Sequence, residues 1–139
     1  MVKKAIMTIG NSNAMSYLMT TVLGKDFSVT SVNSYKDALS HLRVDLNKDV
    51  IILDIPDTDS DNFELLEHMN SSSLFNNIRT VVISNSDDET LKNRTVELGA
   101  SLFLTKPFDP VYLSDRVKAL TKMETRIIRK KRNFNLNIF

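Results

Sequence analysis

Short apolar runs alternate with longer amphipathic segments along the chain, and this alternation predicts five strands and five helices. Runs rich in β-branched and other apolar residues predict strands over residues 5–9, 27–32, 49–54, 80–84 and 101–104. Between and after these runs, apolar residues recur at helical spacing, and the inner faces of the helices are expected at Met15, Leu18 and Val22; Ala38, Leu39 and Leu42; Phe63, Leu66 and Met69; Leu91, Thr95 and Leu98; and Leu113, Val117, Leu120 and Ile127. Regular alternation with short connections favours right-handed crossovers and a parallel sheet between helical layers. The predicted fold is therefore an α/β, doubly wound, five-stranded parallel sheet with five helices in a three-layer sandwich.

The ends of several helices are also indicated by the sequence. Ser12 or Asn13 and Ser34 are the expected N-caps of the first two helices, because their side chains can accept a hydrogen bond from a free helical N–H. Gly24 stands where a left-handed C-terminal cap is expected for the first helix, and Gly99 where the fourth helix is expected to end.

Composition narrows the class of protein. The chain has 139 residues, 42% of them hydrophobic, which is enough for one core. Its apolar runs are far shorter than a membrane span and no signal peptide is evident, so we expect a cytoplasmic protein. The absence of cysteine excludes disulfides, thiolate metal sites and cysteine nucleophiles.

The net charge is only +1, but acidic and basic residues are unevenly distributed along the chain. Residues 1–115 carry 10 Lys and Arg against 16 Asp and Glu, whereas residues 116–139 carry 8 against 1. A solvated helix end, whose cations complement the helix dipole, accounts for the basic run more simply than a dedicated phosphate-binding patch. We expect one domain over residues 1–124 and a basic C-terminal tail over residues 125–139.

Polar residues follow four of the apolar strands. A parallel sheet brings the carboxyl ends of its strands to one edge, where ligands bind near the switch in strand order. These ends read Gly10-Asn11, Asp54, Ser84-Asn85 and Thr105-Lys106. One carboxylate, one hydroxyl and one ammonium group are therefore expected to meet in a small area.

The acidic stretch after residue 53 has two chemical interpretations. In the first, Asp57, Asp59 and Asp61 begin a calcium loop, but Asn62 stands where such a loop needs Gly and His68 where it needs a bidentate Glu. That interpretation fails on both positions. In the second, Asp54 forms an acyl phosphate, with Lys106 pairing with one phosphoryl oxygen and Ser84 donating to another.

The second interpretation coincides with a family resemblance over residues 4–122. The receiver domain of bacterial two-component response regulators is similar in these segments: Leu53-Asp54-Ile55, Asp61-Asn62-Phe63-Glu64-Leu65-Leu66, Val82-Ile83-Ser84-Asn85, Leu98-Gly99-Ala100 and Phe103-Leu104-Thr105-Lys106-Pro107-Phe108. The resemblance implies a flavodoxin-like fold and a role for each matched position. It implies that Asp54 is the phospho-acceptor, Lys106 the phosphoryl-contacting lysine, Ser84 the switch hydroxyl and Phe103 the switch aromatic, with the Pro56 carbonyl as a metal ligand.

The sequence departs from the family where Mg²⁺ would bind. Members usually carry two adjacent acidic residues after the first strand, and this chain has Gly10 and Asn11. An ion held by Asp54, the Pro56 carbonyl and Asn11 would bind weakly, so we expect slow or absent phosphorylation. With fewer carboxylates nearby, Lys106 is expected to pair directly with Asp54.

The loop after the acceptor departs from the family as well. Thr58 replaces the usual proline and Asn62 the usual glycine, so a reshaped loop is expected, in which Asn tolerates a left-handed backbone. Asp57 or Asp59 remains open as a replacement metal ligand.

The expected function is non-enzymatic signal relay in a two-component phosphorelay. The protein would be either a weakly phosphorylated acceptor or a pseudo-receiver that works by protein contact. The partner would be a sensor histidine kinase or another signalling protein, with a homodimer through the face of the fourth helix, fifth strand and fifth helix. An alternative is a nucleic-acid-associated regulator that uses the basic tail. An enzyme acting on a phosphorylated metabolite is disfavoured, because only three glycines are present and no phosphate-cradling loop is seen.

Overall fold

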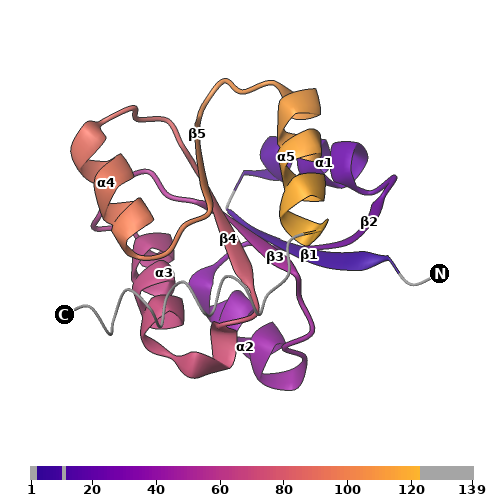
Figure 1. The fold of residues 1–139 in the computed structure, drawn as a ribbon, viewed down its shortest axis with the longest axis horizontal. Helices are drawn as coiled ribbons and strands as arrows, with labels where there is room; N and C mark the ends of the chain where they lie inside the picture. Colours follow the sequence, from indigo (N-terminus) through magenta and orange to yellow (C-terminus); the bar gives the residue numbers. More distant parts are fainter. Residues whose placement is uncertain (1–2, 11, 123–139) are drawn as a thin grey trace.

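A computed structural model describes residues 3–10 and 12–122, and it contains the predicted alternation of strands and helices (Figure 1). The elements are β1 (Lys4–Ile9), α1 (Asn13–Leu23), β2 (Phe27–Val32), α2 (Tyr35–Val44), β3 (Val50–Asp54), α3 (Asp61–Ser71), the 3₁₀ turn η1 (Ser73–Phe75), β4 (Arg79–Ser84), α4 (Glu89–Glu97), β5 (Leu102–Thr105) and α5 (Pro110–Lys122).

The five strands form one parallel sheet in the order β2-β1-β3-β4-β5. From β1 the chain moves outward to β2 and then returns to β3 on the other side of β1. The strand order thus reverses between β1 and β3, and it is at the carboxyl ends beside such a reversal that open α/β sheets bind ligands.

Two hydrophobic cores lie on the two faces of the sheet. Helices α1 and α5 cover one face, where Met19 and Val117 are buried, and α2, α3 and α4 cover the other, where Leu42 and Leu66 are buried (Figure 1). Strand β4 is buried along its whole length, as expected for a central parallel strand covered by helices on both faces. The predicted three-layer, doubly wound fold is confirmed.

The helix caps agree with the sequence in three positions and differ in one. Ser12 accepts a hydrogen bond from the Met15 N–H and Ser34 from that of Asp37, while Gly99 adopts a φ of 93° after α4. The left-handed cap expected at Gly24 is wrong, since its φ is −65° and its ψ −15°. Gly24 continues the right-handed turn and donates to the Thr20 carbonyl, so the chain reaches β2 without a left-handed residue.

The inner face of α1 is rotated from the predicted one. Met19 and Leu23 are its buried residues, whereas Leu18 and Val22 are only half-buried. Both stripes are apolar, so spacing alone does not decide which of them faces the sheet. The predicted inner residue Ile127 lies outside the described part of the chain. Among the described helices, none has the length and apolar character needed to cross a bilayer.

Candidate functional site

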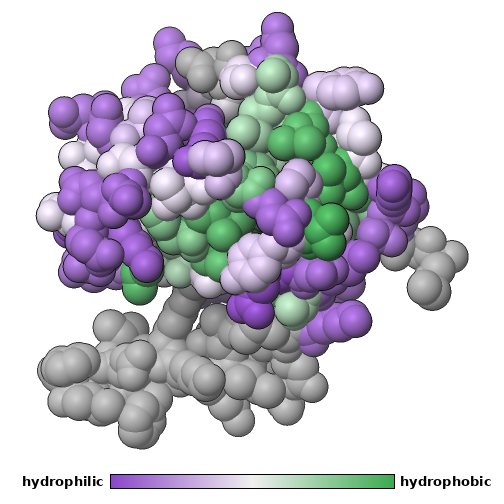
Figure 2. Space-filling model, turned by 90° about the horizontal axis from the view of Figure 1, so that it is seen from above, coloured by the Kyte–Doolittle hydropathy of each residue, from purple (hydrophilic) through white to green (hydrophobic). Residues whose placement is uncertain are grey.

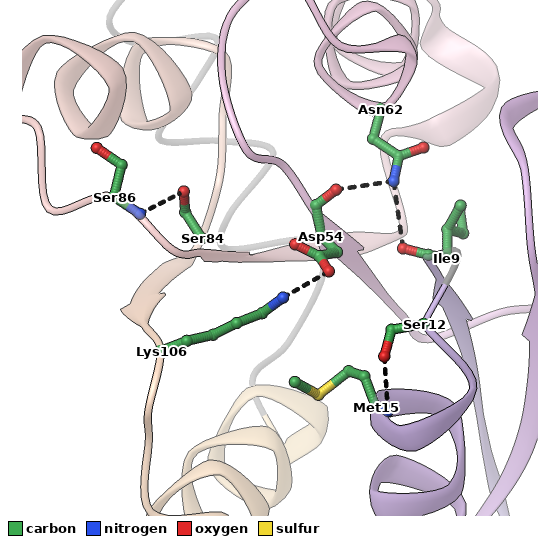
Figure 3. A network of polar contacts seen from close by, with 8 residues as sticks. All are labelled: Ile9, Ser12, Met15, Asp54, Asn62, Ser84, Ser86 and Lys106. Carbon is green, nitrogen blue, oxygen red and sulfur yellow. Dashed lines mark hydrogen bonds and ion pairs between the residues drawn. The ribbon is translucent and has the colours of Figure 1, made fainter.

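The centre of the candidate site is an ion pair between Asp54 and Lys106. Lys106 Nζ lies 2.7 Å from Asp54 Oδ2, and the two side chains are 23% and 19% exposed (Figure 3). Asp54 is the last residue of β3, and Lys106 follows β5, where its own N–H donates to the Ser84 carbonyl at 2.8 Å. The direct pairing of the two groups, expected from the sequence, is present in the structure.

Gly10 lies against Asp54 at the end of β1. A Cβ atom at Gly10 would lie 3.3 Å from Asp54 Cβ and 3.7 Å from Asp54 Oδ2. The first of these distances is shorter than an ordinary contact between carbon atoms. The missing side chain therefore does more than remove a metal ligand, because it lets the end of β1 approach Asp54 closely.

Asn62 connects the ends of β1 and β3 through its side-chain amide. Its Nδ2 donates to the Asp54 carbonyl oxygen at 2.8 Å and to the Ile9 carbonyl oxygen at 3.3 Å (Figure 3). Asn62 lies in the first turn of α3 and does not use the left-handed backbone that asparagine tolerates: no non-glycine residue in the described ranges has a positive φ. The reason is that Ser60 caps α3 two residues earlier and accepts the Phe63 N–H, which places Asn62 inside the helix.

This bridging contact was not predicted from the sequence. One feature of the sequence could have indicated it. Asn62 has a side chain that can donate hydrogen bonds, and it lies in the first turn of the helix that follows Asp54. Which carbonyl oxygens such an amide reaches is decided by how α3 sits over the sheet.

Ser84 lies at the end of β4 and is fully buried. Its Oγ accepts the Ser86 N–H at 3.1 Å, and in Figure 3 its side chain points toward Ser86. Ser86 Oγ in turn accepts from Asp88 N–H, and Asp88 caps α4 by accepting from Thr90 N–H. The hydroxyl of Ser84 is thus the first member of a chain of contacts leading to α4, and it keeps its own proton to donate.

Phe103, in the middle of β5, is half-buried and packs against the core under α2, α3 and α4. It does not line the cleft at the carboxyl edge.

A cleft of about 460 Å³ opens above the ion pair. The structure brings Asp54, Lys106 and Pro56 together there, while Ser84 lies beneath the surface. The lining residues are Ser12, Asn33, Ser34, Tyr35, Asp54, Pro56, Ser60, Asp61, Asn62, Asn85 and Lys106. Most of them carry neutral hydroxyl or amide groups, so the cleft is polar but poor in carboxylates.

The donor set in this cleft does not fit Mg²⁺. The ion requires about six oxygen ligands in octahedral geometry, with carboxylates among them. Asp54 Oδ2 already accepts from an ammonium group, and Asn62 presents an N–H donor. Within residues 3–10 and 12–122, no group of three His, Cys, Asp or Glu side chains could hold a metal. Asn11, the remaining predicted ligand, lies outside the described residues.

The calcium loop is not formed either. Asp57 Oδ1 accepts the Asp59 N–H at 3.0 Å, and Asp61 begins α3, so the three carboxylates do not surround a common point.

Comparison with known proteins shows the family to which this chain belongs. Residues 6–118 match the description "Response regulator receiver domain". The two-component response regulator ORR5 of Oryza sativa subsp. japonica is 32% identical over 106 residues, which cover 76% of this chain and 79% of that protein. The two-component response regulator ARR2 of Arabidopsis thaliana is 33% identical over 108 residues, covering 77% of this chain and 15% of that protein.

Solved structures agree on the fold. A response regulator from Thermotoga maritima superimposes with a TM-score of 0.78 at 23% identity, covering 88% of this chain and all (100%) of that one. The chain therefore belongs to the receiver domains of two-component response regulators. The predicted bacterial origin is not confirmed by these relatives, since ORR5 and ARR2 are plant proteins.

Proposed function

We propose that this receiver domain relays signals by contact with other proteins and accepts a phosphoryl group on Asp54 weakly or not at all. The observation that carries the proposal is the Asp54–Lys106 ion pair at 2.7 Å beside Gly10, which stands where the family carries an acidic residue. The pair satisfies both charges without a metal, and in the described part of the chain no group of three acidic, His or Cys side chains is present to hold one.

Phosphorylation would require this pair to open. An oxygen of Asp54 would attack phosphorus, the bond from phosphorus to the donor would break, and an acyl phosphate would form. Among the described residues Oδ1 accepts no hydrogen bond, so it is the oxygen available for attack. Lys106 would have to leave Oδ2 to meet the incoming phosphoryl oxygens.

The charge balance of that step is unfavourable here. Phosphoryl transfer depends on cations around the three equatorial oxygens. In the described part of the cleft, Lys106 is the one cationic side chain in the lining. We infer that the reaction is slow for this reason.

Ser84 and Phe103 are proposed to report the state of the site. In this proposal the Ser84 hydroxyl turns from Ser86 toward Asp54 when it donates to a phosphoryl oxygen, and the turn loosens the contacts that lead to Asp88 and α4. Phe103 lies half-buried on the neighbouring strand, packed against the core under α2, α3 and α4, and is proposed to move inward when the switch closes.

The face of α4, β5 and α5 is the proposed surface for partners or for a homodimer. Strand β5 lies at the edge of the sheet, and all four of its residues are partly exposed. Val96 on α4 and Tyr112 on α5 are exposed apolar residues, 55% and 49% accessible. Figure 2, seen from the side on which α5 begins, shows apolar residues gathered in a band among hydrophilic ones. The partner would be a sensor histidine kinase or another signalling protein.

The proposed domain covers residues 1–124, and it is proposed to act as a non-enzymatic cytoplasmic signalling domain. The basic tail over residues 125–139, and with it the nucleic-acid alternative, lies outside the described residues.

Intact mass spectrometry after incubation with acetyl phosphate and Mg²⁺ tests the proposal. We expect at most a small fraction of chains to gain one phosphoryl group, and Asp54→Asn to remove that fraction. Complete conversion of the wild type, abolished by Asp54→Asn, would show an efficient acceptor and refute the proposal.

A further inference from the structure

Gly10 and Asn62, two residues at which the chain departs from its family, meet at the same point of the sheet. The ladder between β1 and β3 ends with Ile9 opposite Leu53. Immediately beyond that pair, the Asn62 amide spans the carbonyl oxygens of Ile9 and Asp54 at 3.3 and 2.8 Å, and Gly10 lies against Asp54.

We propose that Asn62 is a positioning residue that joins the ends of β1 and β3 in place of an ion, and that Gly10 allows the two ends to come close enough for this bridge. This inference rests on the proposed function, because it takes Asp54 as the reacting group of the site. Asn62 acts on Asp54 through its main chain and does not touch its carboxylate.

The geometry of the amide supports the bridging role. A side-chain amide has two N–H donors on one nitrogen, which is what two carbonyl oxygens on neighbouring strands require. One of these oxygens belongs to Asp54 itself, so the bridge fixes the peptide unit that carries the acceptor side chain. Asn62 is half-buried. Loss of its amide would therefore leave the carbonyl oxygens of Ile9 and Asp54 without this donor in a poorly solvated place.

A capping role for Asn62 is excluded by its surroundings. Ser60 already caps α3, accepting the Phe63 N–H at 3.2 Å, and the Asn62 nitrogen faces the sheet. The contact therefore serves the strand ends and not the helix.

Gly10 also allows the end of β1 to lie close to Asp54. A side chain at residue 10 would bring its Cβ to 3.3 Å from Asp54 Cβ, so a larger residue there requires the Asp54 side chain or the strand ends to shift by a few tenths of an ångström. We infer that such a shift would strain the Asn62 bridge, which couples residues 10 and 62. In this chain residue 10 is glycine and residue 62 is asparagine, and with these two residues the ends of β1 and β3 are joined without an ion.

The test is a double-mutant cycle on the full chain with Gly10→Asp and Asn62→Gly, which restore the residues usual in the family. Urea unfolding gives the unfolding equilibrium constant of each variant. We expect the penalty of Gly10→Asp to be smaller by more than about three-fold when Asn62 is already Gly, because the ends are then free to separate. A difference below that factor would mean that the two positions act independently and would overturn the proposal.

Mg²⁺ provides a readout that a purely structural role would not move. We expect Mg²⁺ to raise the melting temperature of the double variant and to leave the wild type and Asn62→Gly unchanged. A Mg²⁺-dependent rise in the wild type, or no rise in the double variant, would contradict the proposal. If Gly10→Asp does not fold, Gly10→Ala adds the Cβ alone and the coupling is measured with it.

Asn70→Gly is the matched control, since Asn70 is exposed in the same helix. It should show no coupling to residue 10. Neither readout requires phosphorylation, so efficient reaction with acetyl phosphate would refute the proposed function while leaving the coupling of residues 10 and 62 to be decided separately.

Discussion

Lys106 Nζ and Asp54 Oδ2, 2.7 Å apart, join the ends of β5 and β3 across the intervening strand β4. Both side chains are mostly withdrawn from solvent, so removing either one would leave the other as a poorly solvated, uncompensated charge. It holds the three strand ends of the candidate site in one arrangement, in which the carboxylate already has a cationic partner.

Because Asp54 and Lys106 compensate each other's charge, removing the Lys106 ammonium group should destabilise the fold. Lys106→Met should lower the free energy of unfolding by about 1–2 kcal/mol, between the values typical of exposed and of buried pairs. In an Asp54→Asn background the same substitution should cost much less, because no uncompensated charge remains. Urea unfolding of the four proteins measures this, with Lys92→Met on the exposed surface of α4 as control. Equal losses in both backgrounds would show that the two groups do not interact.

Ser84 should stabilise the loop that precedes α4. Ser84→Ala removes the acceptor of the Ser86 N–H in a buried setting, so we expect a loss of about 1 kcal/mol and faster hydrogen exchange at the Ser86 amide. Exchange measured by NMR should show the change confined to the segment from Ser86 to Thr90. The exposed Ser101→Ala is the control, and an unchanged Ser86 amide would argue against the contact.

The core under α3 can be compared with an exposed leucine nearby. Leu65 is fully buried, and Leu65→Ala should lower stability by about 2–5 kcal/mol through lost contacts and a residual cavity. Leu74 in η1 is 68% exposed, so Leu74→Ala should change stability by less than about 0.5 kcal/mol. Similar losses for the two variants would be inconsistent with the packing described here.

Gly99 is required by its backbone conformation. Its φ of 93° is unfavourable for residues with a Cβ, so Gly99→Ala should cost about 1–2 kcal/mol. Asn adopts such conformations more readily, and Gly99→Asn should therefore be the milder change in thermal unfolding. A neutral Gly99→Ala would mean that the turn after α4 can adopt another conformation.

The elements and their order could be predicted from the sequence because their signals are local. The apolar run of β3 and the serine cap at Ser34 each depend on residues within one strand or one turn, and both are present as predicted. The inner face of α1 was misassigned because apolar residues form two overlapping stripes there. The packing over β1 and β2, which selects Met19 and Leu23, is a tertiary property.

The chemistry of the site was predictable only in part, because some of its contacts depend on tertiary packing and not on local sequence. Asp54 and Lys106 are strand-end residues, and parallel strands bring such residues together. The amide of Asn62 instead reaches the Ile9 carbonyl oxygen, 53 positions away in the sequence, beside the point where Gly10 lies against Asp54. No local pattern specifies that distance, so the bridge becomes visible only in the folded chain.

The most direct test of the central claim is the effect of Mg²⁺ on the rate at which Asp54 gains a phosphoryl group from acetyl phosphate, followed by intact mass with Mg²⁺ and with a chelator. The Asp54–Lys106 pair and the Gly10–Asn62 contact predict a slow rate that is the same in both solutions. A rate that rises ten-fold or more with Mg²⁺, about 1.4 kcal/mol of transition-state stabilisation, would show that an ion enters the site and would contradict the account.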